Sequence, residues 1–551
     1  MKFQRFFIVF LVFGLLISAC APAGSGKDLS LQDETSATET PVPVSLWLPP
    51  YLPAQFTKGL TLPDEVFLSS AEKNAPIRID VGSDALISQW VFALAAPFST
   101  ITDEISSSDL RSFWRGDDSS ALLMQKLLVD GETKVLFEKL WGPASVAHVT
   151  VTARQELLSG AWAGENTWAI LPFDSLEPGW KVIRVDGQTP IRKKFDPLQY
   201  PLMIPFSVIG SSSDISRFFE INDASAEPLF PPSNRDEQKL TTVMLTGVTA
   251  LVRATAYLME KNGMTYPAIE IGDLLRSADI LHISNEIPFT DTCPNPTTNK
   301  ENDTNLVFCS KPEYIQLLEA IGTDLVELTG DHFRDWGPEA MLNTIAMYDE
   351  RGWQYYGGGK NLEDAISPAL FEVNGNKIAF IGCNGKLSGY ATAKQDNPGA
   401  LHCDMEVMKK VVASVVQKGY LPIFTFQHLE YYSYKINSNL VSDFHQAAEA
   451  GAVVVSGSQA HQPHAFEFYK GALLHYGLGN LFFDQYNEGT ALRQAFIDEH
   501  VFYDGRYIST ELFTIQFIDY ARSRFSTDEE RKDLLDNVFS VSKWQITNLE
   551  E

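Results

Sequence analysis

From residue 240 onward, short apolar runs alternate with amphipathic segments, and this alternation narrows the possible folds more than any other feature. The runs with the length and apolar content of buried strands are Thr242–Leu245, Ile280–Ser284, Leu325–Leu328, Ile378–Ile381, Leu421–Phe426, Ala452–Val455 and Leu473–Tyr476. The segments with the pattern of helices are Pro338–Arg351, Asp404–Lys418 and Asn439–Ala450. This order predicts a mainly parallel, layered α/β sheet.

Polar blocks follow three of these strand candidates. They are Gln427-His428-Leu429-Glu430, Gly457 through His464, and Gly477-Leu-Gly479-Asn480. Residues just after the carboxyl ends of parallel strands lie in the crevice where open α/β sheets bind ligands. Three histidines, an amide and a Gly-Asn turn in such positions predict a metal or oxyanion site.

The last fifty residues indicate antiparallel additions to this domain. Arg493–Ile497 is one expected strand, and the Asp504-Gly505 dipeptide between Val501–Tyr503 and Tyr507–Ile508 suits a type I′ hairpin turn. Ser526-x-x-Glu529 then has the pattern of a capping box that opens a terminal helix. Residues 501–551 are therefore expected to complete the C-terminal domain.

The polar, proline-led stretch Pro231–Lys239 predicts a boundary between a domain at 45–235 and one at 240–500. The first segment resembles the solute-binding domains of phosphate- and molybdate-type transport systems. The similar parts are Ser107–Gly116, Val185-Asp186-Gly187 and Tyr200-Pro201-Leu202. The resemblance implies a periplasmic-binding-protein-like α/β domain with a small oxyanion as ligand. A structural α/β domain without ligand is the alternative.

The first twenty residues have the pattern of an export signal. Lys2 and Arg5 precede an apolar run, Phe6–Ile17, which is too short to span a bilayer. The run ends in Ile17-Ser18-Ala19-Cys20, which resembles the lipobox of bacterial lipoproteins. We expect Cys20 to carry lipid, residues 21–44 to form a flexible tether, and the protein to face outward from the cell membrane. An ordinary cleaved signal with a chance cysteine is the alternative.

Charge and cysteine content narrow the partners and the compartment. The chain has 70 acidic and 43 basic residues, a net charge of −27, which argues against a nucleic-acid partner. Four cysteines remain after Cys20, and proximity in sequence favours the pairs Cys293–Cys309 and Cys383–Cys403 among three possible connectivities. Disulfides are compatible with an extracytoplasmic location. A cysteine metal site is the rival, but the chain has no C-x-x-C pair.

Residues 241–485 contain six polar or glycine-containing blocks: Ser284-Asn-Glu286-Ile-Pro288, Thr329 through Gly337, Gly357-Gly-Gly359-Lys-Asn361, His428, Gly457 through Glu467, and Gly477 through Asp484. With these blocks the segment resembles the CapA family, which is associated with poly-γ-glutamate capsule synthesis and is similar in fold to calcineurin-like metallophosphoesterases. Six blocks in the family's order make the resemblance specific. It implies a metallophosphatase-type layered α/β domain.

The chain departs from the family's pattern at several of these blocks. Val248 stands where the family's first strand is followed by an aspartate, and Gln459 stands at the first histidine of the Gly-x-His-Pro-His block. Gly330-Asp331 replaces a double asparagine, and Leu429-Glu430 replaces a tryptophan and a glycine. Valine cannot bind a metal, and an amide is a poor ligand beside imidazole or carboxylate.

The resemblance implies a site made from the remaining polar residues. The expected ligands of a divalent zinc, manganese or iron ion are Glu286, Asp331, His428 and His461, with His464 as an addition. His332 is the expected general acid, a role that suits imidazole near neutral pH. Arg253 would hold an anionic group, and Asn480 would donate a hydrogen bond to an oxyanion or cap a turn.

Two functions follow from this reading. The first is a metal-dependent hydrolase or transferase that acts on a phosphoester or amide bond in the synthesis of a capsule or another anionic envelope polymer. The second is a catalytically degenerate polymer-binding or assembly factor in the same process, which the loss of ligands at Val248 and Gln459 favours.

Overall fold

The computed structural model describes residues 43–117, 122–298, 306–386, 389 and 391–544. The predicted export signal, Cys20 and residues 21–42 of the predicted tether lie outside the described residues. From Val44 onward the chain forms one compact unit. None of the helices in these ranges is long and apolar enough to cross a bilayer.

The strands of the first half pair with one another to form a ten-stranded sheet in the order β2-β1-β3-β10-β4-β8-β6-β7, with β9 against β4 and β5 against β9. They are β1 (Val44–Trp47), β2 (Val66–Leu68), β3 (Ile77–Val81), β4 (Leu86–Pro97), β5 (Glu104–Ile105), β6 (Lys126–Val129), β7 (Val149–Val151), β8 (Thr167–Pro172), β9 (Trp180–Val185) and β10 (Met203–Gly210). The helices are α1 (Ala54–Thr57), α2 (Ser107–Arg115), α3 (Gly131–Trp141), α4 (Leu157–Ala163) and α5 (Ser212–Ala224). The exact domain boundary stays a prediction.

The second half contains two larger sheets. A nine-stranded sheet has the order β15-β14-β13-β11-β25-β26-β27, with β12 between β13 and β24. Its strands are β11 (Leu240–Thr246), β12 (Val248–Thr249), β13 (Ile280–Asn285), β14 (Leu325–Glu327), β15 (Gln354–Tyr356), β24 (Asn480–Phe482), β25 (Gln494–Tyr503), β26 (Arg506–Phe517) and β27 (Ser523–Phe525). A six-stranded sheet has the order β17-β18-β20-β21-β23-β22. Its strands are β17 (Ala369–Val373), β18 (Asn376–Asn384), β20 (Leu421–Gln427), β21 (Val454–Ser456), β22 (Phe466–Tyr469) and β23 (Ala472–His475). A short pair, β16 (Gly358–Gly359) and β19 (Gly399–Ala400), lies outside both sheets.

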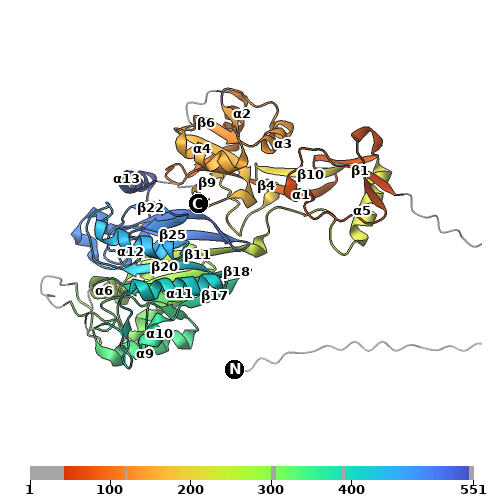
Figure 1. Cartoon of the computed structure of the whole chain (residues 1–551). Coiled ribbons are helices and arrows are strands. Elements are labelled where there is room, and N and C mark those ends of the chain that lie inside the picture. The colour runs from red at the N-terminus through yellow and green to blue at the C-terminus, as the bar shows by residue number, and fades with distance from the viewer. Residues whose placement is uncertain (1–42, 118–121, 299–305, 387–388, 390, 545–551) are drawn as a thin grey trace, which may run out of the picture. The chain divides into compact units, whose positions relative to one another are not determined.

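The two sheets of the second half pack face to face between two helical layers (Figure 1). The core between the sheets joins Val243 and Ile280 of one sheet to Ile378 and Ile423 of the other. The outer face of the nine-stranded sheet is covered by α6 (Arg253–Asn262), α7 (Gly272–Leu275), α8 (Ile315–Ala320) and α9 (Gly337–Arg351). The outer face of the six-stranded sheet is covered by α10 (Leu362–Ile366), α11 (Met405–Gln417) and α12 (Ser438–Glu449).

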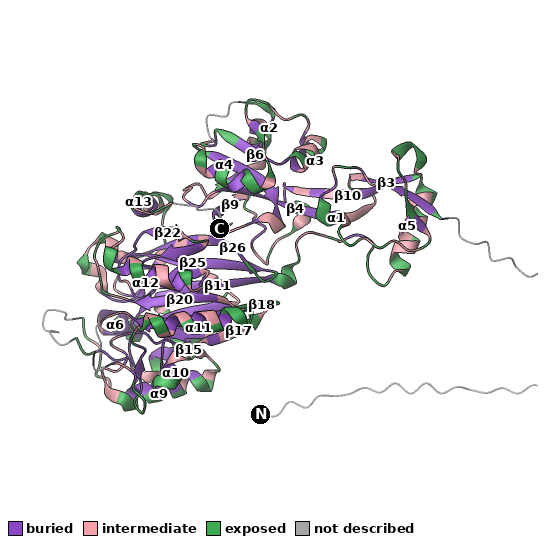
Figure 2. Cartoon of the chain, in the orientation of Figure 1, coloured by how far each residue is buried: buried purple, intermediate pink, exposed green. Residues whose placement is uncertain are grey.

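The strands are apolar on both faces because each sheet is covered on both sides. In β11, Val243 and Leu245 face the other sheet, whereas Met244 packs with the helices. Figure 2 shows β11, β20 and β25 as almost entirely buried ribbons. The α/β class predicted from the alternation is confirmed, but the single sheet was wrong: the parallel runs divide between two sheets, each extended by antiparallel strands.

The C-terminal additions differ from the prediction in two details. The two expected strands before the turn are one continuous strand, β25, which pairs with β26 around Asp504 and Gly505. Both turn residues have positive φ, 49° and 75°, as a type I′ turn requires. The terminal helix α13 (Asp528–Phe539) is capped by Thr527 with Glu530, one residue later than predicted, and these two residues form the reciprocal capping box.

Candidate functional site

The carboxyl ends of strands from both sheets converge on one polar cluster. Glu286 comes directly after β13, Asp331 and His332 lie in the loop that follows β14, and Gln427 is the last residue of β20. One ligand atom each from Glu286, Asp331 and His332 lie within 4.8 Å of one another. Gly330 permits this approach, because a Cβ there would lie 2.9 Å from the Glu286 backbone. The structure thus brings together three of the predicted site residues.

Both oxygens of the Asp331 carboxylate accept hydrogen bonds. The Gln427 amide donates to Oδ1 at 2.7 Å, and the Lys386 ammonium donates to Oδ2 at 2.9 Å. Burial raises the pKa of Asp331, but the charges of Lys386 and His332 and the hydrogen bonds from Lys386 and Gln427 together outweigh it, and the pKa falls below its usual value. Asp331 is therefore an ionised carboxylate at neutral pH.

Glu286 is the most deeply buried acid of the cluster. Its side chain is 2% exposed, and burial raises its pKa above the usual value, while the charges of His461 and His332 oppose the shift. The Gln427 amide donates to its Oε1 at 3.4 Å. A further positive charge in the cluster would therefore stabilise the ionised form of Glu286.

His332 is held by a second carboxylate. The Asp335 Oδ2 atom lies 2.8 Å from Nδ1 of His332, and it also accepts a hydrogen bond from the Phe308 amide at 2.7 Å. Burial lowers the pKa of His332, but the hydrogen bond to Asp335 and the charges of Glu286 and Asp331 raise it to about 9. His332 is thus protonated at neutral pH, the state that a general acid requires.

His461 lies beside the cluster in a fixed orientation. Its Nδ1 is 2.8 Å from Asn480 Oδ1, and its ring stacks on Phe483 with 5.1 Å between centroids. The Asn480 amide nitrogen donates to Gln485 and to the Leu492 carbonyl, so its oxygen faces the imidazole and accepts a proton from Nδ1. In the neutral imidazole the lone pair is then on Nε2, which lies 4.0 Å from Glu430 Oε1. This is the arrangement in which a histidine can coordinate a metal through Nε2. Asn480 positions His461.

The structure does not bring His428 and His464 into the cluster. His428 has Nε2 3.0 Å from Asp443 on α12, and its Nδ1 accepts the Leu429 amide proton at 2.9 Å. His464 has one ring nitrogen near the Tyr476 carbonyl and the other 2.8 Å from the Tyr431 carbonyl. Burial lowers its pKa. Both imidazoles use their two nitrogens in contacts within the fold.

Arg253 contacts a carboxylate of the chain itself. Its guanidinium donates to Asp484 from Nε at 3.1 Å and from an Nη atom at 2.5 Å, and its charge lies over the rings of Phe308 and Phe483. The Asp484 side chain is fully buried. The predicted anion-holding role of Arg253 stays a prediction.

At two of the departures from the family pattern, Val248 and Gln459, the side chain is held by packing or by a local hydrogen bond. Val248 is fully buried in β12, between β13 and β24. The Gln459 amide donates to the Ser284 hydroxyl at 2.6 Å.

Two residues of the cluster had no predicted role. Lys386 follows β18 and bridges Asp331 to Glu430, whose Oε1 is 2.6 Å from its ammonium. Burial raises the pKa of Glu430, but the charges of His461 and Lys386 lower it below the usual value. The only sequence signal for Lys386 is its place directly after a buried run, the same signal that identified the histidines.

The two disulfides favoured by proximity are both present, Cys293–Cys309 and Cys383–Cys403. Each borders the cluster. Cys309 follows Phe308, whose ring lies 4.7 Å from His332, and Cys383 lies three residues before Lys386.

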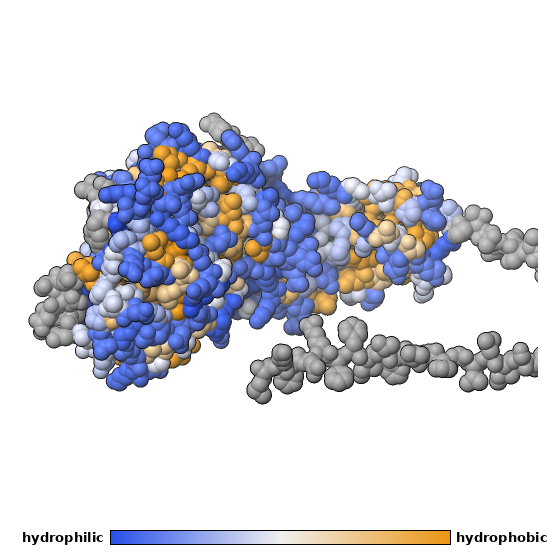
Figure 3. Space-filling model, turned by 90° about the horizontal axis from the view of Figure 1, so that it is seen from below, coloured by the Kyte–Doolittle hydropathy of each residue, from blue (hydrophilic) through white to orange (hydrophobic). Residues whose placement is uncertain are grey.

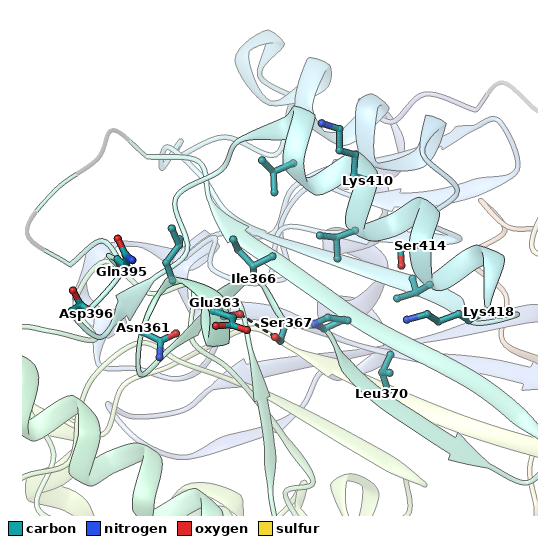
Figure 4. A pocket seen from close by; sticks show the side chains of 15 residues that line it. Asn361, Glu363, Ile366, Ser367, Leu370, Gln395, Asp396, Lys410, Ser414 and Lys418 are labelled. Carbon is teal, nitrogen blue, oxygen red and sulfur yellow. Dashed lines mark hydrogen bonds between the residues drawn. The ribbon is translucent and has the colours of Figure 1, made fainter.

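A separate cavity of about 980 Å³ lies between α10 and α11, away from the cluster (Figure 4). Lys410, Ser414 and Lys418 line one side, and Glu363 and Asp396 line the other. None of the residues of the polar cluster lines it, so we place the candidate site at the strand ends and not in this cavity.

Comparisons with known proteins find relatives of the segment that contains the cluster. Residues 242–485 match the family described as bacterial capsule synthesis protein PGA_cap. The capsule biosynthesis protein CapA of Bacillus anthracis is 24% identical over 263 residues, 47% of this chain and 63% of that protein. The PGA biosynthesis protein CapA of Bacillus subtilis (strain 168) is 24% identical over 196 residues, 35% of this chain and 52% of that protein. The matched part of the chain thus spans about half to two thirds of these relatives' length.

Solved structures with a distant likeness include both kinds of expected neighbour. A 5′-nucleotidase precursor from Thermus thermophilus is 12% identical, with a TM-score of 0.32, over 54% of this chain and 58% of that one. An ABC-type phosphate transport receptor from Vibrio cholerae is 11% identical, with a TM-score of 0.25, over 32% of this chain and 92% of that one. These likenesses are too low to indicate an activity or a ligand. The segment that contains the whole polar cluster, residues 242–485, is therefore similar to the bacterial capsule synthesis family and to the two CapA proteins.

Proposed function

We propose that this chain takes part in the synthesis of a capsule or another anionic envelope polymer of the poly-γ-glutamate kind. The observation that carries the proposal is the polar cluster of Glu286, Asp331 and His332, which lies inside the segment that matches the capsule synthesis family. Its two relatives from Bacillus are named as capsule and PGA biosynthesis proteins.

We further propose that the protein works outside the cytoplasm, anchored to the membrane by lipid on Cys20. The lipobox-like Ile17-Ser18-Ala19-Cys20 supports the anchor. The two disulfides support the location, because such cross-links form and persist in oxidising compartments. The net charge of −27 disfavours broad contact with a polyanion, so a polymer of this kind would be held locally at the cluster.

The donor set fits a divalent metal. Glu286 and Asp331 offer carboxylate oxygens, and His461 offers Nε2 because its Nδ1 is engaged by Asn480. A carboxylate has about four lone-pair sites, so Asp331 retains acceptor capacity beside its hydrogen bond from Gln427. When bound, a zinc, manganese or iron ion would polarise a phosphoester or amide carbonyl and lower the pKa of a bound water.

The residues of the chain supply the proton chemistry. His332 is protonated at neutral pH and is held at Nδ1 by Asp335, so its ring is oriented and its charge is fixed. A proton from this imidazole to the departing oxygen or nitrogen would assist cleavage of a phosphoester or amide bond. The reaction class is therefore hydrolysis or transfer, with His332 as the acid.

A second candidate is a polymer-binding or assembly factor without catalysis. It is favoured by Val248 and Gln459 at the two positions where ligands are expected, and by the hydrogen bonds that already occupy both oxygens of Asp331. In this case the cluster would be a structural remnant of the site, and the function would lie in contacts with polymer or with other proteins.

Metal content is the first test. The full chain, dialysed against each metal and then against buffer, should retain about one equivalent of zinc, manganese or iron, and Glu286→Gln and His461→Ala should lose it. His445→Gln is the control, because His445 lies on α12 and stacks on Tyr469 outside the cluster. If the natural chain retains no metal, the metal-dependent function is contradicted and the non-catalytic candidate remains.

Activity is the second test. We expect the metal-loaded chain to shorten poly-γ-glutamate, measured by size-exclusion chromatography, and His332→Gln to slow this by about 100-fold. An unchanged chain length with every metal would exclude the hydrolytic reading for this polymer.

A further inference from the structure

Lys386 is the cation of the cluster that no sequence motif indicated. It stands two residues after β18, and its side chain is 18% exposed. Its ammonium lies 2.9 Å from Asp331 Oδ2 and 2.6 Å from Glu430 Oε1. One positive charge thus joins two carboxylates that come from the ends of different sheets.

The backbone of this lysine is fixed by the strand ends around it. The Lys386 amide donates to Asn384 Oδ1 at 2.8 Å, and the Gly385 amide donates to the Gln427 carbonyl at 2.7 Å. The Asn384 side-chain amide in turn donates to the Thr329 carbonyl at 2.8 Å and to Gln427 Oε1 at 2.7 Å. Hydrogen bonds at the ends of three strands therefore fix the position of the lysine in the cluster. It differs in this from an exposed lysine that pairs with an acid at the surface.

The position of the ammonium conflicts with that of a metal. An ion bound by Glu286 and Asp331 would share the Asp331 carboxylate with the ammonium, and two cations a few ångströms apart repel strongly in a partly buried site. The same ammonium also neutralises Glu430, whose Oε1 lies 2.6 Å from it. Metal and ammonium therefore compete for the Asp331 carboxylate.

We propose that Lys386 is the built-in counter-cation of this cluster, which balances Asp331 and Glu430 without a metal and which must leave them before a divalent ion can bind. The inference concerns the same cluster as the proposed function. It holds whether the natural chain works with a metal, by displacing the lysine, or without one.

The test compares Mn²⁺ and Zn²⁺ affinities of full-length variants by calorimetry after treatment with a chelator. We expect Lys386→Met to bind at least one of the ions about tenfold more tightly than the natural chain, because the competing charge is gone. Lys386→Arg, which keeps the charge, should stay within about twofold of the natural chain. Lys360→Met is the matched control, because Lys360 pairs with Asp349 outside the cluster, 2.8 Å away. Glu286→Gln added to Lys386→Met should abolish the gain, which would place the ion at the cluster.

Thermal denaturation provides the second readout. Without metal, Lys386→Met should melt at a lower temperature than the natural chain, and the metal that binds more tightly should restore the loss. Should Lys386→Met fold too poorly for calorimetry, Lys386→Gln replaces it, since its amide can still donate to Asp331. Equal or weaker metal binding by the variant that lacks the charge would overturn the inference.

These outcomes separate the inference from the proposed function. If Lys386→Met binds metal and the natural chain does not, the result supports Lys386 as the counter-cation and excludes metal chemistry for the natural protein. If the natural chain binds metal as tightly as Lys386→Met, the proposed metal is supported and the competition between Lys386 and the ion is contradicted.

Discussion

At the scale of single residues, His332 connects the cluster to a carboxylate outside it. Asp335 accepts from the ring and from the Phe308 amide, so the same oxygen fixes both the imidazole and the aromatic side chain next to it. The pKa of about 9 is a consequence of that contact and of the nearby charges of Glu286 and Asp331. Folding and protonation are therefore linked at this residue.

The stability of the metal-free protein should depend on pH through His332. A pKa raised from 6.5 to about 9 by folding stabilises the native state fully below about pH 6.5, and this stabilisation is lost as the pH rises through about 9. We expect the natural chain to exceed His332→Gln by up to about 3 kcal/mol at pH 6 and by nothing above about pH 9.5. Urea denaturation at a series of pH values in chelator measures this difference, and a pH-independent difference would contradict it.

The Arg253–Asp484 pair should contribute to stability. Asp484 is fully buried, and Arg253 holds its position with a left-handed φ of 46°, which is costly for a residue with a side chain. Arg253→Ala removes the guanidinium from a buried carboxylate, and we expect a loss of about 3 kcal/mol in the free energy of unfolding. Lys532→Ala, which breaks an exposed pair with Asp536 on α13, should leave the denaturation midpoint unchanged. Equal midpoints for the natural chain and Arg253→Ala would contradict the prediction.

Which polar residues meet at the cluster could be predicted only in part. Glu286, Asp331 and His332 follow buried strands, and their convergence follows from the parallel arrangement. His428 has the same sequence signal, yet it is drawn away by Asp443, fifteen residues further along the chain. A position after a strand predicts the edge of the sheet but not the direction of the side chain, which depends on partners from other elements.

At the scale of elements, strands with short, mainly apolar runs were predictable, whereas β25, whose run is interrupted by three consecutive ionisable residues, was not. Ile280–Ser284 and Leu421–Phe426 differ from β13 and β20 by one residue at the end. By contrast, β25 was expected as two strands because Asp498, Glu499 and His500 interrupt its apolar run. These residues are buried, and two of them have partners on other strands: Asp498 lies 2.6 Å from His475, and His500 lies 2.7 Å from Thr510.

The sequence pattern also could not predict that the strands divide between two sheets. The strand runs of both sheets have the same apolar composition, because each is covered on both faces. Periodicity therefore identifies a buried strand but not the sheet to which it belongs.

The Cys383–Cys403 disulfide should stabilise the element that carries Lys386. It links β18 to the segment before α11, 20 residues later. Replacement of both cysteines by serine should lower the free energy of unfolding by about 3 kcal/mol, mainly because the unfolded chain gains freedom. Guanidinium denaturation of the double variant measures this loss, and reduction of the natural chain should reproduce part of it. A double variant as stable as the natural chain would contradict the prediction.

At the scale of the whole molecule, aromatic and charged contacts link the strands of the first half to the last elements of the chain. Phe98, which follows β4, packs edge-on against Phe466 and Phe468 and contacts Trp544. Arg531 of α13 donates two hydrogen bonds to Asp103, at 2.7 and 2.9 Å. The face seen in Figure 3 is mostly hydrophilic, with apolar side chains in separate patches.

These contacts predict that the described chain unfolds as one cooperative unit. Calorimetry should show a single transition, and Phe98→Ala should lower its midpoint or split it into two, because about 3 kcal/mol of packing is lost where the two halves meet. Leu198→Ala is the control, because this side chain is 65% exposed. Two resolved transitions in the natural chain would contradict the prediction.

The disulfides beside the cluster also affect when, after synthesis, the candidate site gains its cross-links. Before oxidation, neither the segment that ends at Phe308 nor the strand end that leads to Lys386 is cross-linked. A newly made chain in a reducing cytosol would therefore lack the covalent support of both walls of its own site. If the protein is exported as we propose, both cross-links would form only after export, and the two segments that border the cluster would gain their covalent support there.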